Sequence, residues 1–252
     1  MKAKFICLNL WGGGILIDNI LDFLSIEKPD ILAVQEVYKE ADSSKNIKIY
    51  NSLDLIINNS GLKYLSFAPT YKTLKTSVIV EHGNAVFSRF PIISTDATFY
   101  DLPYDGNFKE PEKDFSSCPR NLQHVVVRIN ERIINIFNTH GIWGFDDEDT
   151  ERRLNMSNKI LEKTKDFKNV ILAGDFNIDM KSQTIKNIEK NLNNLFLKEF
   201  ESSFNLKYKN GAIFSKLAVD TVFVSHDINI IEKRSSKADV SDHLPLIMTF
   251  EI

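Results

Sequence analysis

The chain of 252 residues has little cysteine, with only Cys7 and Cys118. Two distant thiols cannot build a disulfide framework, and they do not supply a structural zinc site. They could form one disulfide, but we expect reduced thiols in a cytoplasmic protein. The amino-terminal run lacks the long apolar region and cleavage site of a signal peptide. No stretch of ~18 apolar residues occurs, so we expect no transmembrane segment.

The chain also lacks the motif of a nucleophile elbow and the motif of a phosphate-binding P-loop. No Gly-x-Ser-x-Gly occurs, which argues against a serine hydrolase with a nucleophile elbow. The run Gly12-Gly13-Gly14 is not followed by Lys and then Ser or Thr, as a P-loop requires. The net charge of −3 gives no bulk attraction to nucleic acid or anionic lipid, although a local basic groove could still bind either.

The composition is that of an ordinary soluble globular protein, with 43% hydrophobic and 26% charged residues. No repeat or linker stands out, so we predict one domain over residues 1–252. Strand-like runs alternate irregularly with helical patterns, which favours packed sheets covered by helices. We predict helices at 17–25, 51–59, 148–165 and 183–191. We predict strands at 5–10, 31–34, 64–68, 77–80, 85–87, 125–129, 133–138, 170–173, 219–224, 228–231 and 246–250.

Residues 102–119 hold three of the seven prolines and show no periodicity, so they predict a long loop. Loops of this length in a compact domain are usually functional or disordered. The acidic side chains in and beside this loop would repel a long polyanion if the loop borders a cleft. They are Asp101, Asp105, Glu110, Glu112 and Asp114.

Polar side chains stand at the ends of several predicted strands. Burying an acid costs free energy unless it is paired or binds a metal, and Glu36 follows the apolar run 31–34. Glu36 could equally be a helix amino-terminal charge or an ordinary strand-end acid. Asp175 and Asn177 are two residues apart, so on an extended segment they face the same side. Such a pair can orient a water and bind a phosphate oxygen, although the local sequence is also typical of a turn.

Two histidines extend this pattern. His243 could stabilise charge on a phosphoryl oxygen if a carboxylate holds its ring, and Asp220 is the natural partner. His140 ends an apolar run, where a core histidine bonded to a backbone carbonyl is an alternative. Arg120 precedes a strand and could either clamp a phosphate or lie solvated in its loop.

The ordered set of these motifs resembles the endonuclease/exonuclease/phosphatase superfamily, the deoxyribonuclease I-like fold. The resemblance runs from residue 9 to residue 243 and therefore covers essentially the whole chain. It implies an α/β fold of two packed mixed β-sheets flanked by helices, a four-layer α/β/β/α sandwich with the site where strand ends converge. The matching segments are Asn9; Gln35-Glu36; Gly83-Asn84-Ala85-Val86-Phe87-Ser88-Arg89-Phe90-Pro91; Asn138-Thr139-His140; Gly174-Asp175-Phe176-Asn177; Asp220; and Ser241-Asp242-His243.

The resemblance implies a divalent metal. Glu36 would be the main magnesium ligand, with Asn9 and Asp242 close by. These oxygen ligands suit Mg²⁺, which usually takes one or two carboxylates and keeps several waters, and Mn²⁺ would suit them as well.

The resemblance also implies catalytic roles. Asp175 would orient or deprotonate the attacking water, and Asn177 would bind a phosphate oxygen. His243, paired with Asp220, would stabilise the transition state, while His140 would contact the phosphate or assist the leaving group. Whether Asp175 or the Asp220–His243 pair is the base stays open.

The substrate is the open part of the prediction. We expect a monomeric phosphodiesterase that acts on nucleic acid or a nucleic-acid-linked phosphoester by attack of a metal-activated water. The alternatives are a phospholipid head group or small phosphoester as substrate, and an inactive binding protein. We predict substrate contacts from Asn84, Arg120 and Trp143. A basic groove for nucleic acid could use Lys72, Lys75, Lys207, Lys209 and Lys216 with Tyr71, Trp143 and Tyr208, although these side chains could simply solvate loops.

Overall fold

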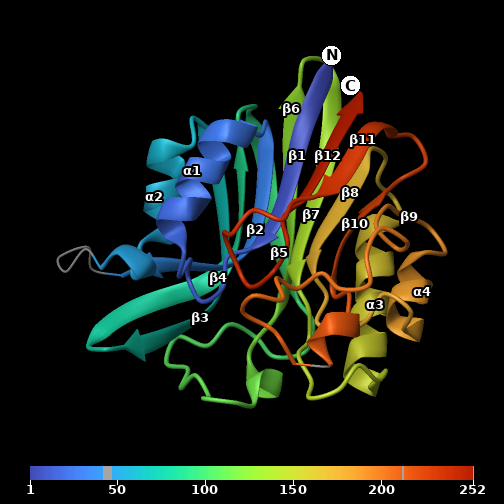
Figure 1. Ribbon diagram of the computed structural model, residues 1–252. Helices are drawn as coiled ribbons and strands as arrows, with labels where there is room; N and C mark the ends of the chain where they lie inside the picture. Colours follow the sequence, from blue (N-terminus) through green and yellow to red (C-terminus); the bar gives the residue numbers. More distant parts are fainter. Residues whose placement is uncertain (42–46, 212, 252) are drawn as a thin grey trace.

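Two six-stranded mixed β-sheets form the centre of the computed structural model, which describes residues 1–41, 47–211 and 213–251 (Figure 1). The first sheet has the order β11 (Asn229–Ser235), β12 (Leu246–Glu251), β1 (Lys2–Asn9), β2 (Ile31–Glu40), β4 (Val78–Ser88) and β3 (Tyr64–Lys75). The second has the order β5 (Ile92–Phe99), β6 (Asn121–Ile129), β7 (Arg132–His140), β8 (Val170–Asp175), β10 (Asp220–Val224) and β9 (Asn193–Asn194). Strands β1 and β2 are parallel, as are β7 and β8.

The period-two alternation of β1 explains how the layers assemble. Phe5 and Cys7 belong to the core cluster between the sheets, whereas Ile6 and Leu8 belong to the cluster under the first two helices. These helices are α1 (Ile17–Glu27) and α2 (Ser52–Asn59). The strand is therefore apolar on both faces and reads as one continuous hydrophobic run.

Helices α3 (Glu151–Thr164) and α4 (Gln183–Ile188) flank the second sheet on the opposite side of the molecule (Figure 1). Met156 and Ile160 of α3 and Ile185 of α4 are fully buried against its strands. Burying each such side chain contributes ~1.5–3 kcal/mol relative to exposure. The predicted four-layer α/β/β/α sandwich is confirmed.

Most predicted elements are present, and the errors have physical reasons. The runs 77–80 and 85–87 form one strand, β4, because polar residues continue the pairing between them. Strand β5 was not predicted, because it is an edge strand whose side chains are mostly exposed and polar. The two-residue strand β9 is too short to leave a pattern.

The loop 102–119 runs along the outer edge of β3. A backbone bridge joins Tyr71 to Asp105, and the Phe108 N–H donates to the Lys72 carbonyl at 2.9 Å. The loop contains a short 3-10 helix, Phe115–Ser117. The prediction of a long segment outside the sheets is therefore correct, and its pairing with β3 gives it a fixed path.

No helix in the described ranges combines the length and the apolar character that a membrane span requires. Both cysteines are buried and free.

Candidate active site

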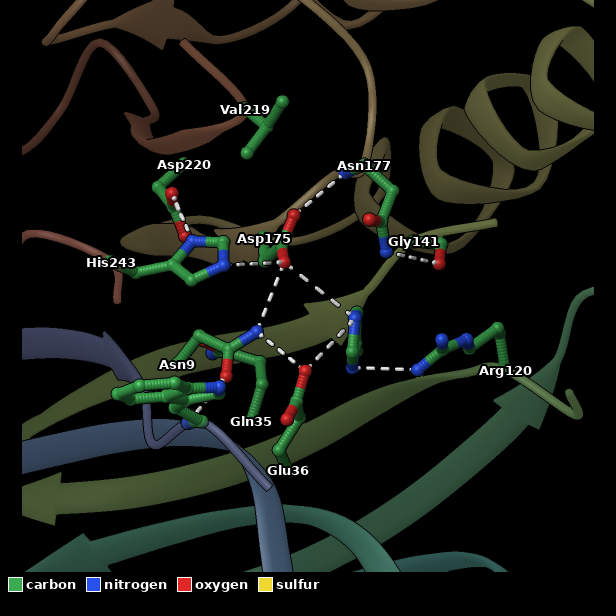
Figure 2. Close-up of polar contacts among 12 residues, drawn as sticks. Asn9, Gln35, Glu36, Arg120, Gly141, Asp175, Asn177, Val219, Asp220 and His243 are labelled. Carbon is green, nitrogen blue, oxygen red and sulfur yellow. Dashed lines mark hydrogen bonds and ion pairs between the residues drawn. The ribbon is translucent and has the colours of Figure 1, made fainter. Parts of the chain in front are cut away.

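A cleft of about 470 Å³ opens at one end of the two sheets, where the polar strand ends converge. The pairing register brings them together, since Asp175 lies beside His140 on one neighbour strand and beside Asp220 on the other. Of the predicted catalytic, metal-binding and substrate-binding residues, those that line the cleft are Glu36, Arg120, His140, Trp143, Asp175, Asn177, Asp242 and His243. Asn9 and Asp220 lie directly behind them, bonded to Asp175 and His243 (Figure 2).

Asp175 occupies the centre of this arrangement. Its Oδ2 accepts a hydrogen bond from Asn9 Nδ2 at 3.0 Å, and its Oδ1 accepts one from the Asn177 backbone N–H at 2.8 Å. The Nε2 atoms of His140 and His243 approach Oδ2 to 3.6 and 3.8 Å. Burial and the nearby Asp220 raise the pKa of Asp175 to about 6, against the opposing effect of His243. A carboxylate with such a pKa can accept a proton near neutral pH.

His243 is held as a cation. Burial opposes its charge, but the carboxylates of Asp220 and Asp175 outweigh burial and raise its pKa to about 10. Its Nδ1 lies 2.7 Å from Asp220 Oδ2, which also accepts a 2.7 Å hydrogen bond from Ser203 Oγ. This pairing fixes the ring and directs its Nε2–H toward the cleft.

His140 is held neutral by the opposite kind of neighbour. Burial lowers its pKa well below the ordinary range, and the Arg120 guanidinium lowers it further. Arg120 Nη1 lies 2.6 Å from His140 Nδ1. Because the guanidinium can only donate, Nδ1 must accept and the proton of the ring sits on Nε2. His140 therefore presents an uncharged N–H donor to the cleft.

The backbone around Glu36 aims its carboxylate into the cleft. Strand β2 carries a bulge between Val34 and Val37, and Glu36 within it has a φ of 58°. Bulges next to active sites commonly re-aim a side chain. The glycine-rich turn after β1 then wraps the carboxylate, with the Gly12 N–H 2.5 Å from Oε2. An added Cβ on Gly13 would lie 2.1 Å from the Tyr38 ring, so only glycine fits there.

The site carries more negative than positive charge, which suits a cation. Five carboxylates, from Glu36, Glu110, Asp175, Asp220 and Asp242, face four cationic groups, from Lys75, Arg120, Lys209 and His243. Oxygen donors of this kind are those that Mg²⁺ and Mn²⁺ prefer. Ligand atoms of Asp175, Asp220 and His243 also lie within 4.8 Å of one another. In that group His243 Nδ1 and Asp220 Oδ2 are already bonded to each other at 2.7 Å, which makes it the poorer candidate.

Asn9 is oriented as a donor in this structure. Its Nδ2 bonds both Asp175 and, at 3.1 Å, Glu36 Oε1, while its Oδ1 accepts the Trp11 N–H at 3.0 Å. In this orientation Asn9 aligns the two carboxylates, and binding a metal through Oδ1 would require its amide to turn over.

Asn84 lies away from the cleft, in contrast to the substrate contact predicted for it. Its side chain is fully buried between the sheets, and its Nδ2 donates to Asn121 Oδ1 at 3.0 Å. The same interior holds a chain of buried amides, in which Gln35 donates to Asn138 and Asn138 donates to Gln123. The polar character of the motif at Asn84 therefore serves the packing of the two sheets.

The predicted basic groove is largely neutralised by ion pairs. Lys75 bonds Glu110 at 2.6 Å, Lys207 bonds Asp239 at 2.5 Å, and Lys209 bonds Asp242 at 3.3 Å. Glu110 belongs to the loop 102–119 and lines the cleft, so that loop does border the site with an acid.

Sequence reasoning missed several residues of the site. Ser203 orients Asp220, and Tyr38 and His82 build one wall of the cleft together with Tyr71, which the sequence had suggested as a stacking residue. Ser203 gives no local signal, because it comes from a loop that only the fold brings to Asp220. The rings of His82 and Tyr71 are stacked with their centroids 4.6 Å apart. His82 was missed because it occupies an ordinary position within β4.

Comparisons with known proteins agree with this geometry. The model of the Endonuclease/Exonuclease/phosphatase family matches residues 6–243. Similar solved structures include an endonuclease/exonuclease/phosphatase from Beutenbergia cavernae (TM-score 0.75, 16% identity, covering 100% of this chain and 72% of that chain). They include D. rerio TDP2 complexed with single strand DNA product (TM-score 0.72, 15% identity, 100% and 99% covered). A third is the Bacteroides thetaiotaomicron mannosyl-6-phosphatase Bt3783 (TM-score 0.66, 18% identity, 99% and 100% covered).

A search of curated proteins finds no match. The family match covers nearly the whole chain, and the strand-end carboxylates, amides and histidines converge on one cleft. The chain therefore belongs to the endonuclease/exonuclease/phosphatase family, whose members are phosphoester hydrolases.

Proposed function

We propose that this protein is a divalent-metal-dependent phosphodiesterase that acts on nucleic acid or a nucleic-acid-linked phosphoester. The observation that best supports this activity is the set of groups around Asp175 Oδ2. An amide donor, a neutral histidine and a cationic histidine approach this oxygen within 3.0–3.8 Å. A base flanked by one neutral and one charged donor suits attack by water on a phosphorus atom whose oxygens gain charge.

A magnesium or manganese ion would be held by Glu36 and Asp242, with Asn9 beside them. When bound, the ion would polarise the phosphoryl oxygen and lower the pKa of a bound water. The excess of carboxylates over cations in the cleft supports this assignment.

The protein's own groups would divide the remaining work. Asp175 would accept a proton from the attacking water. The Nε2–H of His140 and that of the cationic His243 would each donate to a non-bridging phosphate oxygen. Asn177 Nδ2 donates one hydrogen to the Gly141 carbonyl at 3.1 Å, and its second hydrogen is available for the phosphate.

The cleft walls support a substrate that carries planar bases. Trp11, Trp143 and Phe214 line the cleft, and Trp11 contacts the Tyr208 ring at 4.8 Å. Aromatic faces bind unpaired bases without strong sequence preference, at ~1–3 kcal/mol per base. Arg120 is 4% exposed and has no carboxylate within salt-bridge distance among the described residues, so a phosphate would supply the missing negative partner.

A second candidate is a phosphatase for a small phosphoester. It is favoured by the ion pairs of the cleft, because Lys75 and Lys209 are bonded to Glu110 and Asp242 and so offer little net positive charge to a long polyanion. Tyr38 and His82 in the same cleft could instead bond the hydroxyls of a small leaving group.

Hydrolysis of three substrates with Mg²⁺, with Mn²⁺ and with a chelator tests the choice. The substrates are a labelled single-stranded DNA oligonucleotide, mannose 6-phosphate and a phospholipid vesicle. We expect metal-dependent cleavage of the oligonucleotide to be the fastest. Preferential release of phosphate from the sugar phosphate would replace the first candidate by the second. Full activity in chelator would contradict the metal dependence.

A further inference from the structure

Arg153 is a buried charged residue that the mechanism above does not use. It lies in the first turn of α3 and is 1% exposed, and it is the largest side chain among those essentially fully buried in the described chain. A cation at the amino-terminal end of a helix is opposed by the helix dipole, and burying a guanidinium costs several kcal/mol. The structure must therefore offer strong compensating contacts.

Backbone carbonyls of two loops provide that compensation, together with the Asp146 carboxylate, whose Oδ1 lies 3.5 Å from Nη1. Nη1 donates to the Asp146 and Glu148 carbonyls at 3.0 and 2.7 Å, and Nε donates to the Ile142 carbonyl at 3.2 Å. Nη2 donates to the Asn177 carbonyl at 2.8 Å. The first three carbonyls follow His140 and the last follows Asp175, so one guanidinium ties together the two loops that leave adjacent strands β7 and β8.

The tied loops carry functional side chains. Asn177 adopts a left-handed backbone with a φ of 55°, and its N–H bonds Asp175 Oδ1. Asparagine tolerates this conformation better than most residues with a side chain, and the Arg153 bond to its carbonyl fixes the backbone there. Trp143 follows Ile142 directly and lines the cleft. The fit is tight, because a Cβ added to Gly144 would lie 2.8 Å from Arg153 Nη2.

We propose that Arg153 is a positioning residue that acts through Asn177, holding its amide toward the phosphate of the substrate. The expected effect on kcat rests on the proposed function, whereas the positioning of the two loops does not. A planar fork with five donors can satisfy four carbonyls at once, whereas the single ammonium group of lysine cannot reach both loops.

A double-mutant cycle tests the proposal at saturating substrate. We expect Arg153→Lys to lower kcat by ~10-fold in the wild-type background. In an Asn177→Gly background, where glycine tolerates the same φ, the change should cost less than ~2-fold, because groups that act together are not additive. An equal loss in both backgrounds, or no loss in either, would overturn the proposal. Ile56→Ala in α2 is the control. It removes a buried core side chain that does not line the cleft, and it should lower thermal stability with kcat unchanged.

A spectroscopic arm separates failure of this inference from failure of the proposed function. The chain has two tryptophans, so Trp11→Phe leaves Trp143 as the sole reporter. In that background Arg153→Lys should increase acrylamide quenching of Trp143, and Ile56→Ala should not. If Arg153→Lys does not fold, Gly144→Ala should give the same change by displacing the guanidinium. Unchanged quenching in a folded variant would contradict the positioning role, even if no phosphoester is hydrolysed by the wild-type protein.

Discussion

Two histidines of the cleft, His140 and His243, have similar positions but different charges, one neutral and one cationic. Each points its Nε2 toward the same oxygen of Asp175, at 3.6 Å for His140 and 3.8 Å for His243. Their Nδ1 atoms differ, since His140 contacts the Arg120 guanidinium at 2.6 Å and His243 contacts the Asp220 carboxylate at 2.7 Å. The partner of Nδ1 therefore decides whether the Nε2–H of each histidine is a neutral or a charged donor.

The largest expected effect comes from removing the partner of His243. Asp220→Asn should lower kcat by ~10²–10³-fold, because the ring loses both its orientation and its charge. Steady-state kinetics with the preferred substrate would measure this loss. Asp96→Asn, the same change at an exposed position of β5, should leave kcat unchanged. A loss below ~3-fold in Asp220→Asn would show that the charge on His243 is not used.

Removing the partner of His140 should have a smaller effect. Arg120→Met should lower kcat/KM by ~10–10²-fold, the cost of a lost hydrogen bond to a charged group. The exposed Arg128→Met in β6 is the matched control. If Arg120→Met raised activity, the neutral state assigned to His140 would be wrong.

The protonation states themselves can be compared in the metal-free protein. Because the pKa of His243 is raised to about 10 and that of His140 is lowered well below 6.5, only His243 should be an imidazolium at pH 7.5. Nitrogen chemical shifts of labelled histidine would show this directly. A raised pKa stabilises the fold below the unfolded pKa, so the contribution of His243 is present below pH 6.5 and is lost as pH rises through about 10. Two histidines that titrate together near pH 6.5 would remove the distinction.

The smallest effect on activity is expected at Asn84. Asn84→Ala removes the bond to Asn121 between the sheets and should lower the free energy of unfolding by ~1–3 kcal/mol. The KM of the folded protein should stay within ~3-fold of wild type. A KM increase of more than ~10-fold would instead support the substrate contact expected from the sequence.

The sequence predicted which polar residues stand at strand ends better than it predicted which side chains surround them. Glu36, His140 and Asp175 could be chosen because a polar residue at the end of an apolar run is unusual and therefore informative, and His243 could be chosen from the Ser241-Asp242-His243 motif before the last strand. Asn84 looked equally unusual, yet it bonds a neighbouring amide, since facing strands are invisible in a sequence. Contacts between residues far apart in the sequence are equally hard to predict. Arg153 lies 24 residues before Asn177, and no local pattern links the two.

Hydrolysis of bis-p-nitrophenyl phosphate by the wild type and His243→Ala, with Mg²⁺ or Mn²⁺ and with chelator, tests the central claim most directly. Metal-dependent turnover that falls by at least ~10²–10³-fold in the variant is the predicted result. Turnover that survives both the chelator and the substitution would show that this cleft is not the hydrolytic site.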